Sequence, residues 1–161
     1  MNSFSGIGAM PKTPLQTPLH QLYDEDFVRW VEATIACLKE RDTEQLDWDG
    51  LIEEIEDLGK SAKRELESRL SVLLAHLLKR CYINSPNDYR GWQLTILEQR
   101  NALKRLLKQS PSLKGYFQDV LDDVYQDALA EASAAYPASE FPQAAPFGKE
   151  LQALLTEEFW R

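Results

Sequence analysis

One uninterrupted helical pattern between Leu51 and Cys81 constrains the fold of this chain more than any other feature. Apolar residues recur there every three or four positions, and the phase continues across Gly59. The stripe consists of Leu51, Ile55, Leu58, Ala62, Leu66, Leu70, Leu73, Leu77 and Cys81. A helix of this length persists in water only when its apolar face packs against other helices. The pattern therefore predicts a helical bundle built around one long helix over about residues 48–82, with Gly59 allowing the close approach of a neighbour.

The N-terminal part of the chain predicts a flexible arm followed by one helix. Residues 1–21 hold turn formers and few large apolar side chains, so little burial offsets the entropy of ordering them. We expect the first helix to begin near Asp24 or Glu25, since acidic residues suit a helix N-terminus, and to end near residue 41 or 42. Its inward face would hold Phe27, Trp30, Val31, Thr34, Ile35 and Leu38. Asp47 should cap the long helix, because its carboxylate can accept from the free N–H groups of the first turn.

The C-terminal half predicts two more main helices and a short closing one. The run 84–88 is a dense turn signal, and helical periodicity then continues to Ser110, which makes this third helix antiparallel to the second. A fourth helix should start at Pro111, because proline is tolerated in a first helical turn. A proline-rich wrap follows, and a short helix within 151–160 closes the chain. No period-two run occurs, so the predicted fold is all-α: an up-and-down helical bundle of four main helices, with residues 22–161 as a single domain.

Composition and charge disfavour several function classes. The chain has 26 acidic and 18 basic residues and a formal charge of -8, which repels polyanions and disfavours binding of nucleic acid or anionic membranes over the whole surface. Cys37 and Cys81 are too few for a disulfide framework or a thiolate metal cage. The first twenty residues lack the pattern of a secretory signal, and no apolar run reaches the length of a membrane span. We therefore expect a cytoplasmic protein with no membrane partner.

Six short phrases occur in a fixed order along the chain. They are Y-D-E-D-F at 23–27, L-I-E-E-I-E-D-L-G at 51–59, E-L-E-S-R-L-S-V-L-L-A-H-L-L-K at 65–79, W-Q-L-T-I-L-E-Q-R at 92–100, S-P-S-L at 110–113 and L-L-T-E-E-F-W at 154–160. Together they make residues 22–160 resemble the bacterial domain-of-unknown-function family 29, which is abundant in cyanobacteria. The resemblance implies an all-helical fold and no established activity. The family's pattern has Cys-Pro where this chain has Ala145-Pro146, so the resemblance implies no functional thiol in this tail.

A polar margin of the long helix is the strongest chemical candidate. Glu54 and His76 flank the apolar stripe, and Glu98, Gln99 and Arg100 lie on the next helix. Carboxylates and imidazole that converge inside a bundle can bind a metal or a small molecule. The structural alternative, a polar network that specifies the packing of the helices, is the preferred interpretation.

Two observations favour the structural alternative. The residue three before His76 is Leu73, so the Glu-x-x-His pattern of ferritin-like sites is missing, and the only other histidine is His20. Gln99 projects within an apolar stripe, where a buried amide needs partners. Its expected partners on the antiparallel helix are Glu54, Glu56 and His76.

Charge is segregated along the chain. Residues 42–57 contain eight acidic residues and neither Lys nor Arg. The third helix is basic, with Arg90, Arg100, Lys104, Arg105 and Lys108. Opposite charges on neighbouring helices would favour one packing order. The sharper alternative, a nucleic-acid surface at Lys104, Arg105 and Lys108, lacks a helix-turn-helix pattern, a phosphate loop or a stacking platform.

The sequence predicts no catalytic set. Ser71 and Ser110 have no histidine pattern beside them, and Cys81 lies on the apolar stripe. The leading hypothesis is a non-enzymatic protein–protein interaction module that binds a protein partner or a second copy of itself, without a cofactor. The alternatives are a metal- or small-molecule-binding bundle and, third, nucleic-acid binding through the basic helix.

Overall fold

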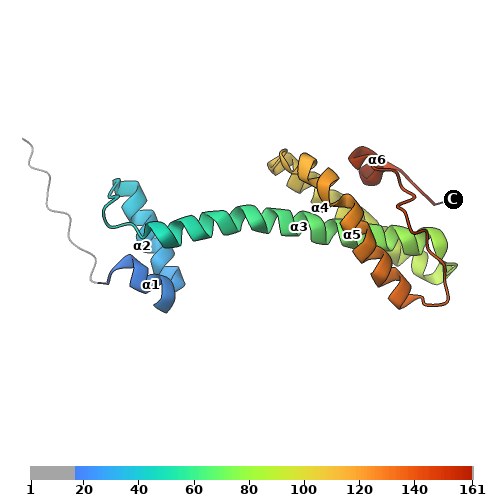
Figure 1. Ribbon diagram of the computed structural model, residues 1–161, viewed down its shortest axis with the longest axis horizontal. Coiled ribbons are helices and arrows are strands. Elements are labelled where there is room, and N and C mark those ends of the chain that lie inside the picture. The colour runs from blue at the N-terminus through green and yellow to red at the C-terminus, as the bar shows by residue number, and fades with distance from the viewer. Residues whose placement is uncertain (1–16, 161) are drawn as a thin grey trace, which may run out of the picture. The chain divides into compact units, whose positions relative to one another are not determined.

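A computed structural model describes residues 17–160, and these residues form helices without any strand. The helices are α1 (Leu19–Glu25), α2 (Phe27–Glu40), α3 (Trp48–Tyr82), α4 (Pro86–Gln109), α5 (Leu113–Ala135) and α6 (Leu151–Thr156) (Figure 1). The all-α prediction is confirmed, as are the long helix over 48–82 and its continuity through Gly59. Contacts divide the chain into two compact units, Met1–Asp57 and Leu58–Arg161. The prediction of a single domain over 22–161 places no boundary there and stays a prediction.

The first unit begins with two helices where the sequence predicted one. Asp26 separates them, because its carboxylate accepts from the backbone N–H of Arg29 at 3.1 Å and so caps α2. The predicted helix start at residue 24 or 25 is therefore wrong, and the predicted arm overlaps α1 at residues 19–21. Residues 1–16 of that arm lie outside the described residues. The predicted end of α2 is confirmed at Arg41, which adopts the left-handed conformation with φ 59°.

Asp47 joins two elements of the first unit. Its Oδ1 accepts from the backbone N–H of Gly50 at 3.1 Å, which confirms the predicted cap of α3. Its Oδ2 accepts from the indole Nε1 of Trp30 at 3.1 Å, so the cap also ties α2 to the start of α3. A Cβ at residue 50 would overlap Oδ2 of Asp47 and lie 3.3 Å from the ring of Trp30. The small core around this contact consists of Leu19, Leu22, Trp30, Cys37 and Leu46.

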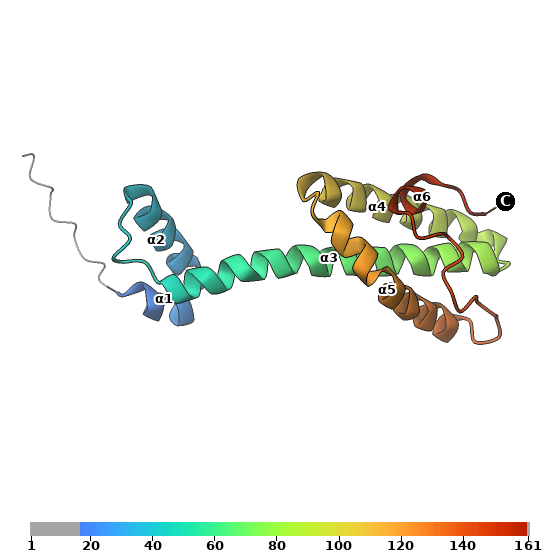
Figure 2. The same ribbon diagram turned by 45° about the horizontal axis from the view of Figure 1, so that its top comes forward.

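The second unit is a helical bundle with a larger core. In Figure 2, α4 runs back along the second part of α3, and α5 then runs in the opposite direction to α4. The fully buried side chains of α3 include Leu66, Leu70, Leu73, Leu74, Leu77 and Leu78. They pack with Ile96 and Leu103 of α4 and with Phe117 of α5. These contacts confirm the C-terminal half of the predicted stripe as core.

The chain after α5 wraps onto the second unit as predicted. Phe141 and Phe147 are buried, and the Tyr125 hydroxyl donates to the Pro142 carbonyl oxygen at 2.6 Å. The closing helix α6 contacts α4 and α5 and ends at Thr156. The chain beyond it is not helical, although Trp160 still packs against the core. Within the described part of the chain, no helix is both long and apolar enough to cross a membrane.

The environments of Gly50 and Gly59 predict opposite effects of the same substitution. Gly50→Ala should lower the free energy of unfolding by about 1–3 kcal/mol, because the new methyl group displaces the Asp47 carboxylate from the N–H groups that it satisfies. Gly59→Ala should raise it by up to about 1 kcal/mol, since a helical interior favours alanine. Urea unfolding measures both.

Gly59 serves as the matched control because nothing lies within 4 Å of the position that its Cβ would take. The same observation shows that the predicted close approach of a neighbour at Gly59 is wrong. Equal stability of the Gly50→Ala variant and the parent chain would contradict the role assigned to Asp47.

Candidate functional site

Glu54 connects α3 to α1 within the first unit. One of its carboxylate oxygens accepts from the Tyr23 hydroxyl at 2.9 Å. This bond is the main reason that the pKa of Tyr23 is raised above its usual range, since ionising the phenol would break it and place two negative charges together. The Tyr23 ring also packs edge-on against Trp30, with centroids 5.0 Å apart. Glu54 therefore has a structural partner.

His76 is half-buried on α3 in the second unit. Its Nδ1 lies 2.8 Å from the carbonyl oxygen of Val72, and because a carbonyl only accepts, Nδ1 is the protonated nitrogen. Burial lowers the pKa of His76, and the positive charge of Lys79 acts in the same direction. The Val72 bond and the carboxylate of Glu131, which pairs with Lys79 at 3.4 Å, act against it. The balance favours a neutral ring.

Gln99 bonds to a cation rather than to the side chains expected from the sequence. Its Oε1 accepts from Nη1 of Arg69 at 3.4 Å. Arg69 also donates through Nε to Glu65 at 2.8 Å, one turn earlier on α3. The expected partners, Glu54, Glu56 and His76, are therefore replaced by an arginine.

Arg100 holds the C-terminal end of α6. Its Nε donates to the carbonyl oxygen of Leu154 at 2.8 Å, and its Nη2 donates to that of Glu157 at 2.5 Å. A cation at these positions satisfies carbonyl groups that a helix end leaves free and complements the negative end of the helix dipole. Glu98, two residues earlier in the sequence, is exposed on α4. Arg100 thus acts in packing α6.

The predicted polar cluster is distributed over separate local contacts. Glu54 belongs to the first unit, whereas His76, Gln99 and Arg100 bond to three different groups in the second. Among residues 17–160, no group of three or more His, Cys, Asp and Glu side chains is arranged to hold a metal ion. The contacts that these side chains make stabilise helix packing.

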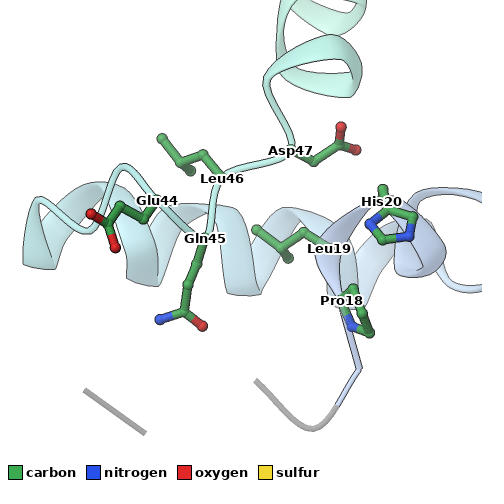
Figure 3. A pocket seen from close by; sticks show the side chains of 7 residues that line it. All are labelled: Pro18, Leu19, His20, Glu44, Gln45, Leu46 and Asp47. Atoms are coloured by element: carbon green, nitrogen blue, oxygen red, sulfur yellow. The ribbon is translucent and has the colours of Figure 1, made fainter. Parts of the chain in front are cut away.

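A pocket of about 310 Å³ lies in the first unit, between the start of α1 and the loop before α3 (Figure 3). It is lined by Pro18, Leu19, His20, Glu44, Gln45, Leu46 and Asp47. Leu19 and Leu46 belong to the core, and Asp47 caps α3. The walls of the pocket therefore already serve the fold of the unit.

Exposed apolar side chains are concentrated in the first unit. Each leaves between 45 and 66 % of its surface accessible. They are Phe27, Val28, Ile35, Leu38, Trp48, Ile52 and Ile55. Helical periodicity predicted inward positions for several of these side chains, and the structure shows that the prediction is wrong for Phe27, Ile35, Leu38 and Ile55. It is also wrong for Leu58 of the predicted stripe, the first residue of the second unit, which is 71 % exposed. Periodicity identified the apolar positions, but it could not show which of them another helix covers.

On α3 these side chains form one face with an acidic border. At about 100° per residue, Trp48, Ile52 and Ile55 fall within a narrow arc of the helix. The exposed acids beside this arc are Asp49, Glu53 and Glu56. The side chains on the opposite border of the arc already have partners within the first unit: Leu51 packs on the small core, and Glu54 accepts a hydrogen bond from Tyr23. We call the six exposed residues the acidic apolar face of α3.

The chain matches the profile of a known protein family. The profile of the family described as "Domain of unknown function DUF29" matches residues 22–160. The chain belongs to the DUF29 family. No curated protein and no solved structure matches it. The DUF29 match begins within α1 and continues past α6, so it includes residues of both units.

The contacts of Arg100 predict a local effect of its removal in this DUF29 chain. Arg100→Ala should increase amide hydrogen exchange in residues 151–157 by about tenfold or more, because the loss of two charge-assisted bonds costs about 1.5–3 kcal/mol. Arg105→Ala, an exposed position on the same helix, is the control and should leave that segment unchanged. Unaltered exchange in the Arg100→Ala variant would show that α6 is held by its apolar contacts alone.

The buried ring of His76 predicts a pH dependence of stability. Because the folded pKa lies below the ordinary value of about 6.5, the unfolded chain binds the proton more readily. The contribution of His76 to the free energy of unfolding is therefore complete above about pH 6.5 and declines as the pH falls towards the folded pKa.

His76→Gln should remove this dependence while keeping a side-chain donor for Val72. Urea unfolding of both proteins between about pH 8 and pH 5 measures the difference. Parallel stability profiles would contradict a lowered pKa for His76.

Proposed function

We propose that the chain is a protein–protein interaction module whose acidic apolar face on α3 binds a basic amphipathic helix. The observation that carries this proposal is the exposure of Trp48, Ile52 and Ile55, which is 51, 52 and 60 %. Soluble monomeric proteins rarely leave a contiguous set of large apolar groups in water, and such patches commonly mark interaction sites. Covering them contributes about 25 cal/mol for each Å² removed from water.

The shape of the face favours a helical partner. Trp48, Ile52 and Ile55 follow the i, i+4, i+7 spacing of one helix face. Helix-in-groove recognition uses anchors at this spacing. A partner helix with leucine-sized residues at matching positions would interdigitate with them.

The charge of the face specifies a basic partner. Asp49, Glu53 and Glu56 border the apolar arc, and residues 42–57 contain no Lys or Arg. An acidic partner would meet like charges along the whole contact, whereas lysine or arginine beside the apolar anchors would be attracted. Since these charges are exposed, their effect should weaken as the salt concentration rises.

A labelled synthetic helix tests the proposal directly. The probe carries leucines at positions i, i+3 and i+7 with lysines beside them, and binding is measured by fluorescence anisotropy. We expect saturable binding that weakens by about tenfold or more in the Ile52→Asp, Ile55→Asp double variant, because aspartate removes the apolar contact. Aspartate attracts the lysines of the probe, so the weaker binding cannot come from charge repulsion. Binding should also weaken between about 50 and 500 mM salt.

Leu94→Asp provides the matched control. Leu94 is an equally exposed leucine, at 58 %, but lies on α4 of the second unit. This variant should bind the probe as the parent chain does. Binding that survives the double substitution, or no binding by the parent chain, would refute the proposed function.

A further inference from the structure

A second exposed face in the same chain has the opposite charge. On α4, Leu94 and Leu97 leave 58 and 55 % of their surface accessible. The exposed bases on the same side of the helix are Arg90, Lys104, Arg105 and Lys108. At about 100° per residue, all six positions fall within an arc of about 100°. We call them the basic face of α4.

The buried side of α4 explains why this face is left in water. Ile96, Leu103 and Leu107 pack into the core of the second unit, and Arg100 bonds to α6. The basic face lies on the remaining side of the helix. Lysine and arginine at those positions keep the helix soluble, but the two leucines between them gain nothing from exposure.

We infer that the helix bound by the acidic apolar face is α4 of a second copy of this chain, so that copies associate head to tail. The inference rests on the proposed function. The two faces match in chemistry, because each has large apolar residues bordered by charges of a single dominant sign. They also match in spacing, since Ile52 and Ile55 are three residues apart, as are Leu94 and Leu97.

Charge also selects the direction of the contact. If Ile52 lies opposite Leu94 in a parallel arrangement, Arg105 comes opposite Lys63, which is unfavourable. An antiparallel arrangement that pairs Ile52 with Leu97 and Ile55 with Leu94 instead carries the basic C-terminal end of α4 past Trp48, towards the acidic residues that precede α3. It also places the negative end of one helix dipole beside the positive end of the other.

A contact between two different faces is heterologous, so a single contact leaves one unused face on each of the two copies. Each copy that uses its acidic apolar face still has a basic face free for the next copy, so assembly continues into chains or rings. Since each contact contains only a few apolar anchors, we expect association at micromolar concentration or above. The exposed charges should make it sensitive to salt.

Sedimentation velocity on paired variants tests the inference. One variant disables the acidic apolar face with Ile52→Asp and Ile55→Asp, and the other disables the basic face with Leu94→Asp and Leu97→Asp. The parent chain should form species larger than a dimer as its concentration rises. Each variant alone should remain a monomer. An equimolar mixture should form a one-to-one dimer and nothing larger, because one intact face of each kind remains.

A second set of variants, which change only charge, tests whether the apolar-to-aspartate variants lose association merely because they fail to fold. Glu53→Lys with Glu56→Lys, and Lys104→Glu with Arg105→Glu, alter only exposed side chains. Each pair alone should weaken association of the chain with itself by about tenfold or more, because like charges then face each other. Mixing the two should restore association, because an intact acidic apolar face meets an intact basic face and the two reversed faces also have opposite charges. Circular dichroism of every variant is the folding control, and each variant should keep the helix content of the parent.

Three results would overturn the inference. The first is a parent chain that stays monomeric at every concentration, and the second is a mixture of the two apolar variants that stays monomeric. The third is a basic-face variant that associates as the parent does, which would assign self-association to another surface. Binding of the synthetic basic helix by a strictly monomeric parent would leave the proposed function intact and refute only the identity of the partner.

Discussion

The apolar stripe of α3 is the constraint on which the rest of the structure depends. Along one side of this single helix, Leu66, Leu70 and Leu73 are fully buried, whereas Ile52 and Ile55, at nearly the same angular positions, are exposed. In the second unit, α4 and α5 supply the cover that the stripe requires. In the first unit, the contacts of α3 with the small core and with α1 are made by Leu51 and Glu54, and Ile52 and Ile55 stay exposed. The same pattern therefore acts as core in one part and as surface in the other.

The first unit has few means of stabilising itself. Its described residues bury only a small set of large apolar side chains, and chains of about 40 residues usually need a disulfide, a metal or association to stay folded. Cys37 and Cys81, the two cysteines of the sequence, form no disulfide with each other. Polar ties partly replace burial: Asp47 joins α2 to α3, and Glu54 joins α1 to α3. A helix laid on the acidic apolar face would add the apolar burial that this unit lacks.

Local features of the fold could be predicted from the sequence, and contacts between distant residues could not. The bounds of α3 and its cap at Asp47 follow from periodicity and from groups within one helical turn. The acidic run around Asp26 contained several acids able to cap a helix, so the break between α1 and α2 was not visible. Arg100 was singled out as polar, but its acceptors are Leu154 and Glu157, more than fifty residues away. The exposure of Ile55 depends likewise on which helices fold back, which periodicity does not encode.

The two exposed faces divide affinity and selectivity between different side chains. An exposed ion pair contributes about 0.2–1 kcal/mol, so the acids beside Ile52 and Ile55 can add little to the strength of a contact. They act chiefly by attracting a basic helix during the encounter and by excluding acidic ones, effects that change association rates and vary with salt. The apolar anchors act on the lifetime of the complex, because they must be returned to water when it dissociates. In a chain with a net charge of -8, a locally basic helix such as α4 is therefore the kind of surface that an acidic face can select.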